Sequence, residues 1–175
     1  DADGVRVFLR DADRGEHWSL GSSPVLAESG TFFARAAVGS VLLGRRHGGI
    51  EATCEIVVPE GEDAEARRLR IRNRSVDPRR IEVTVVAELV VGHRGGDQGH
   101  PAFSKLFVET AAQASGVLTA RRRPRSRNES PLWAAAALHG AGELQFETDR
   151  DRFVGRGRSL HDPVAMLAEG PLSGT

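Results

Sequence analysis

The sequence has 175 residues, which fits one domain that buries most of its apolar surface. Hydrophobic residues make up 39% and charged residues 27%, a composition typical of a soluble globular chain, which excludes a disordered one. The 24 basic and 24 acidic side chains cancel, so no net field recruits nucleic acid or an anionic membrane surface.

The single cysteine, Cys54, excludes an internal disulfide framework. No apolar run approaches the roughly 20 residues that span a bilayer, so we expect no membrane contact by this segment. We expect no signal peptide in this segment. We also expect the polypeptide to continue past residues 171–175, because these residues are not typical of a C-terminal tail. We therefore expect a piece of a larger multidomain protein.

Alternating apolar residues predict strands through the first half of the chain. In residues 50–58 the apolar side chains share one face and Glu51, Thr53 and Glu55 share the other. The same pattern predicts strands in residues 5–10, 32–38, 41–43, 68–72 and 81–91. A polar turn separates residues 68–72 from 81–91, which favours a hairpin.

Residues 100–110 hold a dense apolar segment with aromatic and β-branched residues, which favours a buried strand, although so short an apolar run also fits a helix. We expect buried side chains there and in the preceding strand, namely Val83, Val85, Leu89 and Phe107.

Further strands are predicted at residues 117–120, 132–138 and 144–148. Residues 132–138 have helical propensity, but their length and their position between strands favour a buried strand. Only residues 162–169 favour a helix, with Asp162 as N-cap and Pro163 in the first turn. Many short strands at hairpin spacing predict an all-β antiparallel sandwich over residues 1–175, with at most one short helix.

The sequence contains no recognisable motif for a catalytic nucleophile, a metal site or a cofactor site. Six scattered histidines lack the close pairing of a helical zinc site, and no Gly-x-Ser-x-Gly elbow occurs. The glycines at 92, 95 and 96 lack the strand–helix context of a phosphate loop. The arginine-rich residues 121–127 fit either phosphate recognition or a solvated strand end, and Pro124 argues against a basic recognition helix.

A charged cluster near the end of the chain suits a sugar. Carboxylates and guanidinium groups bond paired hydroxyls, and an aromatic ring covers the apolar face of a sugar. The candidate carbohydrate-binding residues are Glu147, Asp149, Arg150, Phe153 and Arg156. Trp18 and Trp133 are alternative aromatic platforms, although each also fits a core position.

Several long strings resemble the cyclic β-1,2-glucan synthases and the cellobiose and chitobiose phosphorylases. The strings are HPAFSKLFVET at 100–110, RRPRS at 122–126, ETDR followed by Phe153, Gly155, Arg156 and Gly157, and PLSGT at 171–175. Trp18-Ser19-x-Gly21 and Gly49-Ile50-Glu51 fit the same pattern.

The resemblance implies a supersandwich, galactose-mutarotase-like domain, which is incomplete at the C-terminus because the sequence stops inside a family string. In family members an (α/α) barrel carrying the catalytic Asp follows this sandwich. No residue of this chain matches that Asp, so the resemblance assigns no catalytic residue here. The implied partners are a β-glucan or oligosaccharide, the catalytic barrel of the same protein and a homo-oligomeric copy. A location on the cytoplasmic side follows if the protein is a membrane-bound glucan synthase.

Two functions remain open from the sequence. The first is a carbohydrate-binding or positioning domain of a glucan-active transferase or glycoside phosphorylase, non-catalytic by itself. The second is a structural or assembly domain that packs against the barrel or a second subunit without binding sugar.

Overall fold

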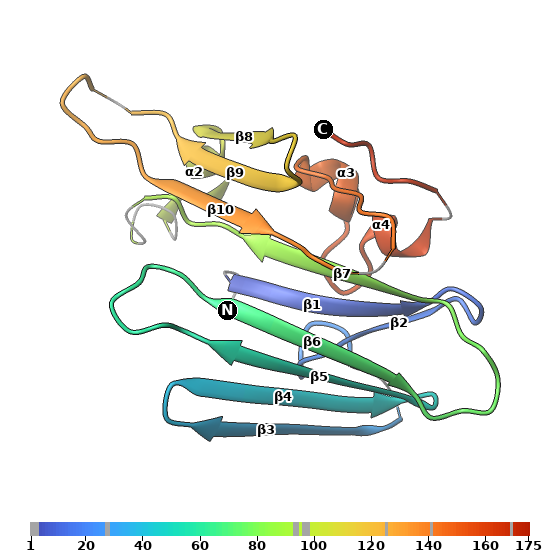
Figure 1. The fold of residues 1–175 in the computed structure, drawn as a ribbon. Helices are drawn as coiled ribbons and strands as arrows, with labels where there is room; N and C mark the ends of the chain where they lie inside the picture. Colours follow the sequence, from blue (N-terminus) through green and yellow to red (C-terminus); the bar gives the residue numbers. More distant parts are fainter. Residues whose placement is uncertain are drawn as a thin grey trace. The chain divides into compact units, whose positions relative to one another are not determined.

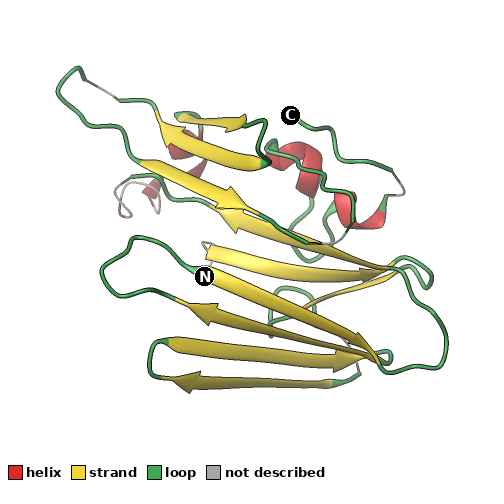
Figure 2. Cartoon of the chain, viewed as in Figure 1, coloured by secondary structure: helices red, strands yellow, loops and turns green. Residues whose placement is uncertain are grey.

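The computed structural model describes residues 4–26, 29–92, 95, 99–124, 126–140, 142–168 and 170–175. Strands dominate these described residues and form three antiparallel sheets (Figures 1 and 2). The predicted all-β class is confirmed. The described residues hold three short helices, α2, α3 and α4, where the sequence predicted at most one. None of these helices has the length and apolar character needed to cross a membrane.

The chain divides into two compact units. Unit 2 comprises Val5–Ala87 and Arg158–Leu167, and unit 1 comprises Asp1–Gly4, Glu88–Gly157 and Ala168–Thr175.

Unit 2 is built from two sheets. One has the order β2-β1-β7, and the other has the order β3-β4-β5-β6. The strands of the first sheet are β1 (Gly4–Asp11), β2 (Glu16–Ser19) and β7 (Ile81–Glu88). Those of the second are β3 (Thr31–Ala37), β4 (Ser40–His47), β5 (Ile50–Val57) and β6 (Ala66–Asn73). The unit also holds α4 (Val164–Leu167), a shorter form of the helix predicted at 162–169.

The core of unit 2 lies between its two sheets. One cluster joins side chains of both: Val7, Leu9, Trp18, Leu20, Ile50, Ala52 and Cys54. Ile50, Ala52 and Cys54 alternate with polar residues along β5, so the predicted inward face of this strand is confirmed. Trp18 is a core residue and only 2% exposed.

A buried ion pair fixes one end of unit 2. Arg79 donates to Asp11, and their side chains are 5% and 1% exposed. Asp11 Oδ1 also accepts the backbone N–H groups of Asp13 and Arg14, at 3.1 and 3.2 Å, which holds the β1–β2 turn. Arg79 Nη1 donates to the Gly48 carbonyl in the β4–β5 turn, at 3.4 Å. The pair therefore connects both sheets of the unit.

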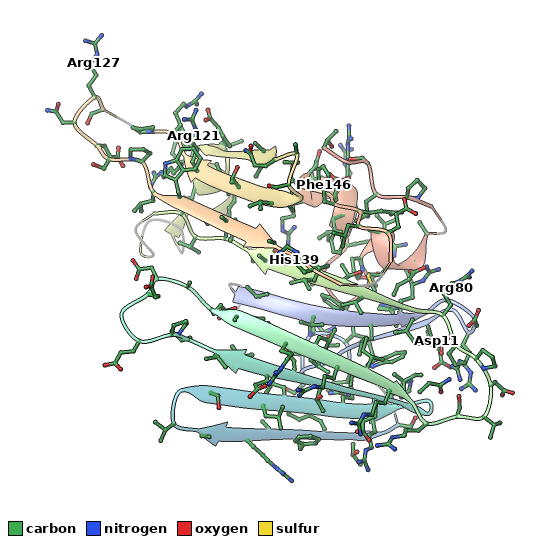
Figure 3. All side chains as sticks on the ribbon, viewed as in Figure 1. Asp11, Arg80, Arg121, Arg127, His139 and Phe146 are labelled. Carbon is green, nitrogen blue, oxygen red and sulfur yellow. The ribbon has the colours of Figure 1, made fainter. Side chains whose placement is uncertain are left out.

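The predicted hairpin of residues 68–72 and 81–91 is wrong. β6 pairs with β5, whereas β7 pairs with β1 in the other sheet. The connecting residues cross from one sheet to the other. They are held there by Arg79 and by the Arg80 N–H, which donates to Asp13 Oδ2 at 2.7 Å (Figure 3).

Unit 1 contains the third sheet, of order β10-β9-β8. Its strands are β8 (Val108–Ala112), β9 (Val117–Arg122) and β10 (Trp133–Ala137), close to those predicted at 117–120 and 132–138. β10 is mostly exposed, so its predicted burial is wrong. Residues 144–148, predicted as a strand, have no regular secondary structure.

The dense apolar stretch at 100–110 is not a buried strand. Pro101 opens the single-turn helix α2 (Pro101–Lys105), a position where its fixed φ and missing N–H are tolerated. The turn brings Phe103 and Phe107 into edge contact, with ring centroids 5.1 Å apart. Phe103 and Leu106 are exposed and Phe107 is half-buried.

The expected burial of the preceding strand holds only in part. Val83 packs against the core cluster, and Leu89 is half-buried. Val85 is exposed, so its predicted burial is wrong.

Replacing Leu9 by alanine should lower the free energy of unfolding by about 2–5 kcal/mol, because the side chain is fully buried in the core of unit 2. Chemical denaturation measures this loss. Leu26→Ala removes the same atoms from an exposed position of the same unit and should change stability by less than about 0.5 kcal/mol. Equal losses in the two variants would place Leu9 outside the core.

Replacing Arg79 by alanine should lower the free energy of unfolding by about 3–5 kcal/mol, because it leaves the buried Asp11 carboxylate without its countercharge. Arg74→Ala is the control, since it breaks an exposed pair with Glu51 and should cost less than about 1 kcal/mol. If both variants denature at the same midpoint, the buried pair does not hold the unit together.

Candidate functional site

The candidate carbohydrate-contact segment, residues 147–156, surrounds the short helix α3 (Arg150–Val154) in unit 1. Asp149 is its N-cap, and its side chain accepts the backbone N–H groups of Asp151 and Arg152. Gly155 ends the helix with φ of 91°, a conformation that favours glycine. No helical period is visible in the sequence here, because the element is a single turn.

Glu147 attaches this segment to the chain end. Its Oε1 accepts the Asp149 N–H at 2.9 Å and lies 3.5 Å from the Thr175 hydroxyl. Beside it, the Thr148 N–H donates to the Thr175 carbonyl at 2.7 Å, and the Gly174 N–H donates to the Phe146 carbonyl at 3.1 Å (Figure 3). Residues 146–148 and 174–175 therefore pair like two short strands.

The surroundings of Glu147 favour its charged form. Partial burial alone would raise the pKa of this carboxyl, but hydrogen bonds from Ser173 and Asp149 and the charge of Arg152 outweigh it. The pKa of Glu147 therefore lies below its usual range.

The two candidate arginines are exposed, as expected for a ligand contact. Arg150 Nε donates to Glu88 Oε1 at 2.9 Å, with side-chain exposures of 56% and 14%. This pair holds the arginine through Nε, and more than half of its side chain stays exposed. Arg156 forms no ion pair within the described parts of the chain. Sequence reasoning missed Glu88, which lies 62 positions before its partner.

Phe153 is buried, at 8% exposed. Such a ring offers no open face to a sugar. Its position in α3 instead makes it an apolar anchor for the exposed residues around it. The structure thus brings the candidate residues into one segment, with Glu147 and Asp149 engaged in its own fold and Arg150 and Arg156 directed to solvent.

A separate groove lies in unit 2, beside the β4–β5 turn, with a volume of about 240 Å³. Arg46 Nε and Arg74 Nη2 lie 2.8 and 3.5 Å from the two oxygens of Glu51. Burial alone would raise the pKa of Glu51, but bonds to the two arginines outweigh it and lower the pKa. The single carboxylate offsets one of the two positive charges beside the groove.

The described residues do not favour a metal site or a cysteine nucleophile. They contain no group of three or more His, Cys, Asp and Glu side chains that would hold a metal ion. Cys54 is a core residue, and burial raises the pKa of its thiol, which disfavours a nucleophilic role.

Comparison with known proteins gives a family match along the whole chain. The family described as glycosyl hydrolase 94, supersandwich domain, matches residues 1–175. The cyclic beta-(1,2)-glucan synthase NdvB of Rhizobium meliloti (strain 1021) is 34% identical over 180 aligned positions, which cover 100% of this chain and 6% of that protein. The N,N'-diacetylchitobiose phosphorylases of Vibrio furnissii and Vibrio proteolyticus are each 26% identical over 168 positions, covering 95% of this chain and 21% of theirs.

Acid should release residues 174–175 from residues 146–148. A carboxyl with a lowered pKa contributes stability above its ordinary pKa, and this contribution is lost as the pH falls through the lowered value. Hydrogen exchange of the Thr148 and Gly174 amides measures the release, compared as protection factors. Glu147→Ala should reduce protection at neutral pH by about tenfold, the size of one hydrogen bond to a charged group. Unchanged protection in this variant would show that Glu147 does not hold the chain end.

Proposed function

The chain belongs to the supersandwich-domain family of glycosyl hydrolase 94, and from this we propose that it is a carbohydrate-positioning domain of a glucan-active protein, without catalytic activity of its own. The observation that carries this proposal is the family match over residues 1–175. The relatives named above carry the name of a saccharide as product or substrate. The chain spans 6% to 21% of the lengths of these relatives. We therefore also propose, and do not infer from the relatives alone, that a larger protein containing this domain acts as a transferase or phosphorylase.

The proposed contact uses Arg150 and Arg156. Glu88 holds Arg150 through Nε, so the outer edge of its guanidinium is positioned before a ligand arrives. Such a fork bonds paired hydroxyls or an oxyanion. Glu147, Asp149 and Phe153 support the arginines through the helix cap, the paired chain end and the buried ring.

The second candidate is a structural or assembly domain that meets a catalytic barrel or a second subunit. It is favoured by one observation: the carboxylates of Glu88, Glu147 and Asp149 are all engaged in contacts within unit 1. A domain that binds sugar should keep carboxylate oxygens available to accept hydrogen bonds from the sugar hydroxyls. The arginines alone supply donors.

Titration with cellobiose, sophorose and linear β-1,2-glucan separates the two candidates. Water competes for exposed guanidinium groups, so binding to the isolated chain should be near millimolar, or about −4 kcal/mol. A folded chain that binds none of the three sugars supports the assembly role.

In the full-length protein, Arg150→Ala should reduce turnover of glucan by about tenfold while the fold stays intact, because one exposed charged hydrogen-bonding group is lost. Arg127→Ala removes another exposed arginine of unit 1 outside the segment and should leave turnover unchanged. If Arg150→Ala instead unfolds the domain, its pair with Glu88 is structural and the assembly role is favoured.

A further inference from the structure

The second tryptophan of the chain is a surface residue. Trp133 opens β10 and is 59% exposed, in contrast to the buried Trp18. A large aromatic side chain on a strand, mostly open to water, is available to a ligand.

Register places Trp133 in a row across all three strands of the unit 1 sheet. Trp133 on β10 is opposite Arg121 on β9, and Arg121 is opposite Glu109 on β8. Directly opposed residues share one face of a sheet. The three side chains therefore lie side by side on the same face, with Arg121, which is labelled in Figure 3, in the middle.

Contacts hold this row in place. The Arg121 guanidinium carbon is 5.4 Å from the centroid of the Trp133 ring, and Arg121 Nε donates to Glu109 Oε2 at 2.7 Å. Cation–π and ion-pair contacts on three rigid strands limit the motion of the indole before a ligand binds. The site is thus positioned in advance.

The next row on the same face leaves space beside the indole. It consists of Ala135, Thr119 and Ala111, which follow the first row two residues along each strand. No large side chain rises from these positions. The surface next to Trp133 is therefore flat. The Thr119 hydroxyl donates to the Ala111 carbonyl at 3.3 Å, and its oxygen can still accept a hydrogen bond.

The chemistry of the row fits a polyhydroxy ligand better than a protein. Arg121 and Glu109 are 47% and 43% exposed, and covering them with an apolar protein surface would remove water from both charges. A sugar instead presents C–H groups to the indole and hydroxyls to the guanidinium and carboxylate. We propose that Trp133, Arg121 and Glu109 form a second carbohydrate-contact site that takes a linear β-linked gluco-oligosaccharide.

This site is separate from residues 147–156, although it rests on the proposed carbohydrate function. Thr110, the neighbour of Glu109 on β8, directs its side chain to the opposite face and donates to Thr148 at 2.9 Å. The first site is therefore joined to the sheet through the face opposite to the tryptophan row. Substitutions can test the two sites independently.

The experiment uses the 175-residue chain and linear β-1,2-gluco-oligosaccharide as the probe. Iodide in water quenches exposed tryptophan, so it reports Trp133 and not the buried Trp18. The probe should reduce quenching, whereas sorbitol at equal concentration should not. Trp133→Ala should weaken binding about tenfold in an NMR titration, the effect of losing one aromatic stacking contact.

Matched variants control for structural damage. Trp133→Phe keeps a ring and should restore most of the binding lost in Trp133→Ala. Leu132→Ala removes an equally exposed apolar neighbour, whose direction alternates with that of Trp133, and should bind like the parent chain. Circular dichroism should show that all variants keep their strands.

The outcomes separate the two proposals. Weaker binding in Trp133→Ala, with rescue by phenylalanine, supports the second site. Binding that is insensitive to Trp133 but weakened by Arg150→Ala overturns the second site and leaves the proposed function standing. No binding to the parent chain overturns both.

Discussion

The buried pair of Asp11 and Arg79 is the interaction on which unit 2 depends. Each partner would be costly to bury alone. Asp11 also bonds the backbone of the turn that follows it, and Arg79 bonds the backbone of the distant Gly48. Through these bonds the pair joins the β1–β2 turn, the β4–β5 turn and the segment that enters β7. The apolar cluster between the sheets stabilises the unit without fixing the relative positions of the strands. The ion pair fixes these positions, because it bonds specific turns at the ends of the strands.

Among the described residues, arginine forms both buried and exposed ion pairs, and the two kinds serve different purposes. Arg79 is buried with its partner and is structural. Arg68 bonds the directly opposite Glu55 across β5 and β6, on an exposed face where such a pair adds little stability. Arg150 and Arg121 are each held by a carboxylate while much of the guanidinium stays open to water. Arg121 differs from Arg68 because the exposed Trp133 ring lies beside its guanidinium.

Sequence reasoning predicted the strands whose apolar residues alternate, such as residues 50–58, because one face of such a strand is buried along its whole length. It failed at residues 100–105 and 150–154, where single-turn helices begin at a proline or a capping aspartate and are too short for a helical period. It also wrongly predicted that β6 and β7 pair as a hairpin. A polar, turn-rich connection looks the same in sequence whether it joins two strands of one sheet or crosses to another sheet. In the candidate segment it identified the exposed arginines. It misjudged Phe153, whose charged neighbours concealed the burial of the ring.

The two tryptophans show why local sequence cannot decide between core and surface. Trp18 is opposite Leu9, and both join the apolar cluster of unit 2. Trp133 is opposite Arg121, whose carboxylate partner lies on the next strand in the same row. Burying that row would require the removal of water from a guanidinium and a carboxylate together, which an apolar contact does not offset. The cross-strand neighbour, set by register, therefore keeps Trp133 at the surface, and it also supplies the polar groups that an exposed indole needs to hold a sugar in one orientation.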